Sequence, residues 1–144
     1  MADSLHQVHI LASDKTVYNA ISRQEGIESW WTDHCEMATQ EGQSSTFWFD
    51  NQRSAFKMRT QKLLPNRRIF WVCEQGPDEW LDTQLWWEIQ PNEDGTCTLD
   101  FKHMNWATDT GLFPVCNSTW GTLMQQLKHY CETGEQRPLF QQSA

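Results

Sequence analysis

The sequence predicts an α+β fold in which an antiparallel sheet of about seven strands curves around one long helix near the C-terminus. Three observations support this prediction. The chain alternates apolar and polar residues at period two for about seventy residues after position 33. Residues 114–132 instead place apolar side chains at helical spacing. Two short helical segments follow the first strand. The length of 144 residues predicts a single domain over residues 1–144.

The long helix has recognisable ends. Pro114 suits a first helical position, and Gly134 stands where a left-handed C-terminal cap is expected. Gly121 lies inside the helix beside Trp120, where we expect it to allow a close approach to the backbone. The predicted apolar stripe consists of Cys116, Trp120, Leu123, Met124, Leu127, Tyr130 and Cys131.

The remaining elements follow from local patterns. The first strand is predicted over residues 5–12, and the two short helices over 14–22 and 24–31. Further strands are predicted over 34–39, 46–50, 55–63, 68–74, 83–89 and 96–103. Short turns join these strands, which predicts antiparallel neighbours in a meander. The tail after Gly134 is expected to lose order beyond Phe140.

Composition restricts the classes of function. The net charge of −8 argues against non-specific nucleic-acid binding, which requires neutralisation of phosphates. No apolar run approaches the ~20 residues of a membrane-spanning helix, and no signal peptide is evident. The five cysteines are widely spaced without a CxxC motif, which favours reduced thiols over disulfides or a zinc site. We therefore expect a cytoplasmic protein without metal or cofactor.

Several local motifs resemble a known family. Residues 17–32 (VYNAISRQEGIESWWT) resemble the signature V-x-x-A-[LI]-[ST]-x-P-E-G-[LI]-x-x-W-W of the START-like (SRPBCC) superfamily, in its AHSA-like branch. The segment DGTCTLDFKH resembles that branch's penultimate strand, and STWGTLMQQLKHYCETGEQRPLF resembles its C-terminal helix. Gln24 replaces a common Pro, and Trp120-Gly121 reverses a common Gly-Trp. The branch is named for an activator of a chaperone ATPase.

This resemblance implies a helix-grip fold of the START and Bet v type, with a cavity between the curved sheet and the C-terminal helix. The leading hypothesis is that the protein binds a small hydrophobic or aromatic ligand, lipids included, in this cavity. The alternative is that the large rings fill the space completely. The side chains predicted to line the cavity are Trp31, Trp48, Phe56, Met58, Trp71, Trp87, Leu99, Phe101, His103, Trp120 and Met124.

Other functions remain open at this stage. His103 has the inward parity of the last strand, so it could anchor a ligand or act as a general base, as a cyclase or dehydratase of the superfamily would require. Alternatively, it is a half-exposed hydrogen-bonding residue at a strand end. The neighbours His34, Cys35 and Glu36 point to opposite sides of a strand, which argues against a metal site. A chaperone-associated interaction module is a third hypothesis, and Trp86 on the outward parity suggests a surface for a homodimer.

Overall fold

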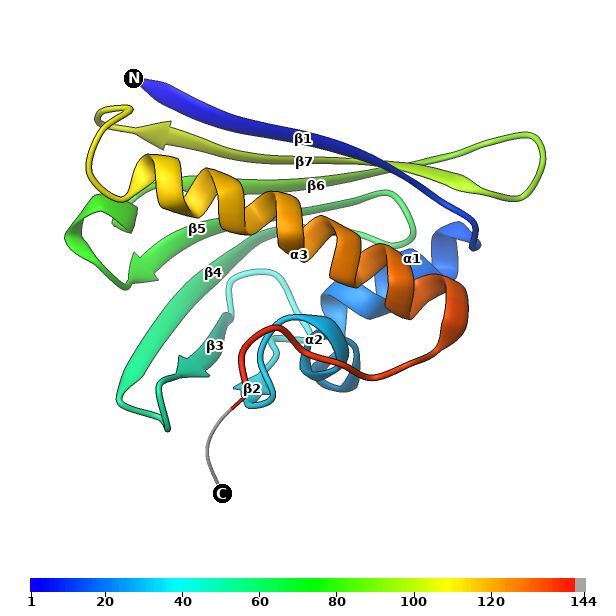
Figure 1. Cartoon of the computed structure of the whole chain (residues 1–144), viewed down its shortest axis with the longest axis horizontal. Coiled ribbons are helices and arrows are strands. Elements are labelled where there is room, and N and C mark those ends of the chain that lie inside the picture. Colours follow the sequence, from blue (N-terminus) through cyan, green and yellow to red (C-terminus); the bar gives the residue numbers. More distant parts are fainter. Residues whose placement is uncertain (142–144) are drawn as a thin grey trace.

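Seven strands form one antiparallel sheet in the computed structural model, which describes residues 1–141 (Figure 1). The spatial order is β1–β7–β6–β5–β4–β3–β2, so every pair except β1–β7 joins strands consecutive in the chain. The predicted meander and its α+β class are therefore confirmed. Of the residues beyond Phe140, where loss of order was expected, 142–144 lie outside the described range. The strands are β1 (Ala2–Ile10), β2 (Cys35–Glu36), β3 (Ser44–Phe49), β4 (Ser54–Leu64), β5 (Arg68–Gln75), β6 (Gln84–Pro91) and β7 (Cys97–Trp106).

The long helix α3 (Phe113–Thr133) lies across one face of the curved sheet, which we call the inner face (Figure 1). Proline occupies its first turn, and Gly134 ends it with a φ of 77°, as predicted. Its stripe is buried at Trp120, Leu123, Met124 and Leu127, and half-buried at the other predicted positions. This stripe packs against the inner face because both surfaces are apolar.

Two short helices, α1 (Asp14–Ser22) and α2 (Gln24–Trp30), form a tight corner after β1. The hydroxyl of Ser13 caps α1 by accepting from the backbone N–H of Thr16 at 3.2 Å. At Gly26 the two helices almost touch, since a Cβ there would lie 2.6 Å from Cα of Ala20. The close approach that we expected at Gly121 is therefore found at Gly26, because a Cβ at Gly121 would meet only the His6 ring at 3.6 Å.

The element with the largest error is the strand predicted over 34–39. Only Cys35–Glu36 pairs with β3. Beyond this pair, the backbone N–H of Ala38 donates to the hydroxyl of Ser45 and not to a strand carbonyl. Between the strands predicted over 68–74 and 83–89 lies a single 3₁₀ turn, η1 (Asp78–Trp80). This turn brings Trp80 back against the sheet.

The prediction that Trp48 of β3 faces the cavity is wrong. Phe47 is completely buried on the inner face, where it pairs across strands with Phe56. Trp48 therefore lies on the outer face, with its ring 4.6 Å from that of His34. Three aromatic residues in a row leave no polar position to reveal the parity of this strand.

Aromatic rings fill the centre of the space between the sheet and α3. The indole ring of Trp120 lies 4.3 Å from Phe101, 5.2 Å from Trp31 and 6.0 Å from Trp87 between ring centroids. The interior beneath the middle of α3 is consequently closed by its own side chains.

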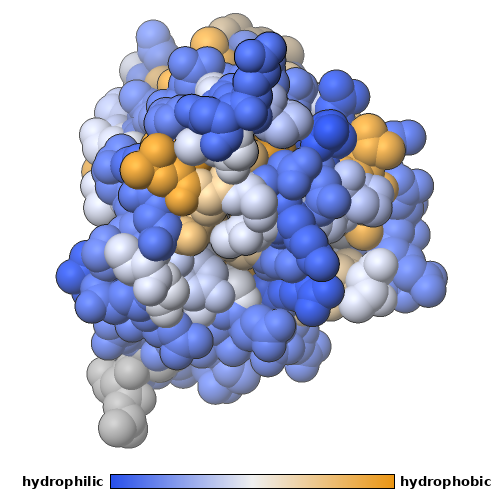
Figure 2. Space-filling model, turned by 90° about the vertical axis from the view of Figure 1, so that its right-hand side faces the viewer, coloured by the Kyte–Doolittle hydropathy of each residue, from blue (hydrophilic) through white to orange (hydrophobic). Residues whose placement is uncertain are grey.

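The face at the right-hand side of Figure 1 is hydrophilic over most of its area (Figure 2). Hydrophobic residues appear there in a few small, separate groups. Scattered apolar side chains of this kind are ordinary on a protein surface. The apolar hollow described next involves the other end of α3.

Candidate functional site: an apolar groove at the start of α3

A groove of about 720 Å³ opens beside the first half of α3. Its lining comes from five places: the start of α3, the turn between β3 and β4 with its flanks, the segment around η1, the end of α2, and the chain after α3. This volume is in the range of small-molecule sites. The lining residues are Trp31, Phe49, Asp50, Ser54, Phe56, Pro77, Trp80, Leu112, Val115, Cys116, Thr119, Trp120, Leu123, Leu139, Phe140 and Gln141.

One wall is a C-terminal strap, which we define as residues 135–141. Its backbone runs beside the end of α2, where Arg137, Leu139 and Phe140 donate N–H bonds to the carbonyls of residues 29, 30 and 31. These carbonyls are the ones that a helix end leaves without internal partners. The strap therefore completes α2 and at the same time presents Leu139 and Phe140 to the groove.

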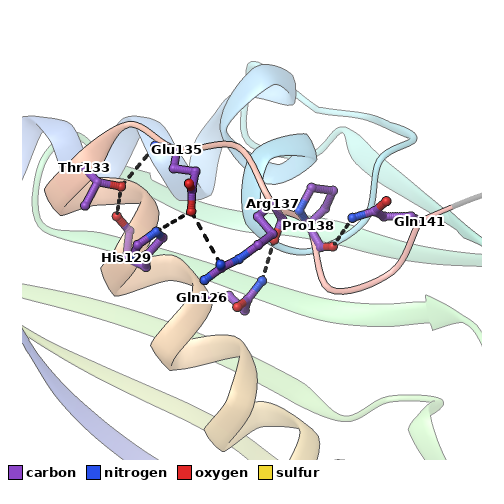
Figure 3. A network of polar contacts seen from close by, with 7 residues as sticks. All are labelled: Gln126, His129, Thr133, Glu135, Arg137, Pro138 and Gln141. Atoms are coloured by element: carbon purple, nitrogen blue, oxygen red, sulfur yellow. Dashed lines mark hydrogen bonds and ion pairs between the residues drawn. The ribbon is translucent and has the colours of Figure 1, made fainter.

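Side chains also tie the strap to α3 (Figure 3). The carboxylate of Glu135 lies 2.7 Å from Nε2 of His129 and 3.5 Å from the guanidinium of Arg137. The hydrogen bond from His129 lowers the pKa of Glu135. In addition, the amide of Gln126 donates to the carbonyl of Arg137. These contacts fix the first residues of the strap to the second half of α3.

The lining of the groove is mostly apolar. The nearly buried rings of Trp31, Trp80 and Trp120 form its floor, while Val115 and Phe140 are exposed at the rim. Among the described residues that line it, Asp50 is the only charged one. A ligand here would bind mainly through apolar contact, with polar contacts restricted to the rim.

The structure brings only part of the predicted site to this groove. Trp31, Phe56 and Trp120 line it, whereas Trp48 lies on the outer face. His103 and six apolar residues are inside the packed core and do not line the groove; the six are Met58, Trp71, Trp87, Leu99, Phe101 and Met124. Ligand contact stays a prediction for Trp31, Phe56 and Trp120.

His103 lies within the core with no exposed surface, so the half-exposed alternative is wrong. The indole N–H of Trp120 can only donate, and it reaches Nδ1 of His103 at 3.1 Å. The ring proton is therefore on Nε2, which donates to the hydroxyl of Thr83 at 2.8 Å, and that hydroxyl donates to the carbonyl of Trp80. Burial lowers the pKa of His103 to about 3. Both nitrogens of this neutral ring are engaged, which leaves neither for a ligand.

The cysteines offer no activated nucleophile in the described chain. All five are unpaired, and burial raises the pKa of Cys35 and of Cys131 to about 12. Burial also raises the pKa of Cys116, the cysteine that lines the groove. A thiol with a raised pKa is protonated at neutral pH and is a poor nucleophile. Within residues 1–141, no group of three His, Cys, Asp or Glu side chains is placed to hold a metal ion.

Sequence reasoning missed most of the groove. Phe49 was overlooked because the parity of β3 was inverted, and Trp80 because it lies between two predicted strands. The strap residues Leu139 and Phe140 were assigned to the tail. A signal was available for these last two, since they are an apolar pair within an otherwise polar stretch.

A curved antiparallel sheet that grips a C-terminal helix, with a groove at one end of that helix, defines a helix-grip α+β domain. The chain belongs to the family described as "Activator of Hsp90 ATPase homolog 1-like protein", which matches residues 11–132. The family resemblance seen in the sequence is therefore confirmed. No helix within residues 1–141 has the length and apolar character to cross a membrane.

Solved structures share this fold. The solution structure of the Aha1 dimer from Colwellia psychrerythraea is 27% identical, with a TM-score of 0.84, and the match covers 93% of this chain and 98% of that one. A crystal structure of a protein from Staphylococcus saprophyticus is 16% identical with a TM-score of 0.79, covering 97% and 98% of the two chains. No curated protein matches this sequence.

Proposed function

We propose that this protein binds a small apolar ligand in the groove beside the first half of α3. The observation that carries this proposal is the contrast between the groove and the rest of the interior. Rings close the core elsewhere, yet about 720 Å³ stays open against Trp31, Phe56 and Trp120. Exposed Val115, Leu139 and Phe140 gather at its rim. Apolar surface left open in this way favours an apolar occupant.

A binding role is better supported than the cyclase or dehydratase alternative. Such an enzyme needs an acid or base that faces its substrate. His103 was the candidate for that role, but its two nitrogens bond to Trp120 and Thr83 inside the core. The proposed setting is the cytoplasm, where the five unpaired thiols would stay reduced.

The test uses N-phenyl-1-naphthylamine, a neutral probe whose fluorescence increases in apolar surroundings. Thr119 lines the groove, and Thr122 lies on the exposed side of α3. Each hydroxyl donates to the carbonyl four residues earlier, which makes the two positions a matched pair. We expect saturable binding to the wild type and to Thr122→Trp, but not to Thr119→Trp, whose indole would fill the groove. Equal binding by both variants, or none by the wild type, would contradict the proposal.

We further propose that the protein forms a homodimer through the outer face of the sheet. The similar structure from Colwellia psychrerythraea is described as a dimer. On the outer face here, the rings of Phe70 and Trp86 stack at 3.9 Å, with Arg68 6.0 Å from the Trp86 ring. Aromatic and arginine side chains are typical of interface centres.

Sedimentation velocity tests this second proposal. The wild type is expected to sediment as a dimer. Trp86→Arg should sediment as a monomer, because the new guanidinium would lie beside that of Arg68 in the proposed interface. Trp48→Arg, on the same face but in β3, is the control and should remain dimeric. A monomeric wild type would overturn self-association, and a dimeric Trp86→Arg would exclude this face.

A further inference from the structure

We propose that the occupant of the groove is an amphiphilic organic cation, with an apolar body and an alkylated ammonium group beside Asp50. This inference rests on the proposed function, because it specifies the chemistry of the ligand in the same groove. It is drawn from one end of the groove, where aromatic rings and a carboxylate occur together. A fatty-acid carboxylate or another anionic amphiphile would be disfavoured there.

Three phenylalanine rings surround this end of the groove. The ring of Phe49 lies 5.0 Å from that of Phe56 with an interplanar angle of 69°, and 5.3 Å from that of Phe140 at 90°. All three rings are partly exposed and line the groove. Each edge-to-face contact covers part of one ring, and the aromatic faces that stay open to the groove attract alkylated ammonium groups.

The charge at this end is negative. Asp50 follows Phe49 directly, lines the groove and forms no hydrogen bond or ion pair through its carboxylate within residues 1–141. No Lys, Arg or His belongs to the described lining. Arg53 is in the same turn, but it does not line the groove, and only its backbone N–H contacts Asp50, at the carbonyl. An anion would therefore meet a carboxylate without a compensating cation, whereas a cation would be attracted.

The turn that carries Asp50 has an unusual backbone. Asp50, Asn51 and Gln52 have φ angles of 53°, 55° and 69°, which place three consecutive residues in the left-handed region. Aspartate and asparagine adopt this region more readily than other residues with a side chain, whereas Gln52 does so at a cost, and strain of this kind concentrates at functional sites. This conformation fixes the position of Asp50 at the end of β3, next to the rings.

The experiment compares three ligands with the same naphthalene body: (2-naphthylmethyl)trimethylammonium, 2-naphthylmethanol and 2-naphthylacetate. Each is titrated against protein loaded with N-phenyl-1-naphthylamine, and displacement is recorded. We expect the cation to bind about tenfold more tightly than the alcohol, in line with aromatic and carboxylate contacts to an ammonium group. The acetate should bind more weakly than both.

Variants separate the local contacts from the overall charge of −8. Asp50→Asn retains a residue that tolerates a positive φ, and it should reduce the preference for the cation about threefold. Glu93→Gln makes the same change of charge in the turn between β6 and β7, which lies at the opposite end of the sheet from the start of α3 (Figure 1) and does not line the groove, and it should have no effect. Phe140→Leu, at an exposed position, should weaken the cation but not the alcohol.

The outcomes distinguish this inference from the proposed function. If the neutral probe binds but the three ligands compete equally, or if Glu93→Gln acts as strongly as Asp50→Asn, the cation proposal is wrong and groove binding stands. If the neutral probe does not bind to the wild type, the proposed function fails first.

Discussion

The indole N–H of Trp120 donates to Nδ1 of His103 at 3.1 Å, in the interior between α3 and β7. This bond joins the long helix to the sheet through a polar contact inside an apolar core. It also fixes the proton of His103 on Nε2, next to Thr83. The contact therefore has a structural role, and His103, which the sequence suggested as a general base, is part of the packed core.

Trp120→Phe should destabilise the protein more than Trp106→Phe. Both rings are buried, but Nε1 of Trp106 has no hydrogen-bond partner within residues 1–141. The change at Trp120 leaves Nδ1 of His103 buried without a donor, which costs about 1–3 kcal/mol beyond the loss of ring volume. Urea unfolding of the two variants measures the difference. Equal destabilisation would show that the bond contributes little.

Acidification should weaken the fold through His103. Its pKa falls from 6.5 to about 3 on burial, so below pH 6.5 the unfolded chain takes up a proton that the folded chain excludes. The free energy of unfolding should therefore decrease by up to about 1.4 kcal/mol per pH unit between pH 6.5 and 3, and this term should be constant above pH 6.5. Urea unfolding from pH 8 to pH 4.5 tests this expectation.

The control for the acid effect is His103→Gln, which has no titrating ring. Its stability should depend less on pH than that of the wild type between pH 6.5 and 4.5. The carboxylates whose pKa is lowered, such as Asp14 and Glu135, lose their contributions mainly below this window. The same slope in both proteins would show that His103 titrates normally in the folded state.

Gly26→Ala and Gly121→Ala should have opposite effects. A Cβ at residue 26 would lie 2.6 Å from backbone atoms of Asn19 and Ala20, so α1 and α2 would have to separate, at a cost of about 1–3 kcal/mol or more. At residue 121 the nearest atom is 3.6 Å away, and alanine should stabilise α3 by up to about 1 kcal/mol. Thermal unfolding of both variants distinguishes them by the sign of the shift in Tm.

The sequence predicted the sheet and α3 well because each has a clear period. In β5, β6 and β7, alternate residues such as Trp71, Trp87 and Phe101 are buried as expected. The groove was harder to predict, since it depends on segments without a period. Trp80 enters it through a 3₁₀ turn, and Phe140 through backbone contacts with the end of α2. Those placements are set by tertiary contacts that no local pattern encodes.

The most direct measurement of groove binding follows the indole N–H signals of the nine tryptophans by NMR during titration with N-phenyl-1-naphthylamine. Trp31, Trp80 and Trp120 form the floor of the groove, while Trp48 and Trp86 lie on the outer face. The account predicts saturable shifts for the first three signals and little change for the other two. Shifts confined to Trp48 and Trp86, or no shifts at all, would contradict it.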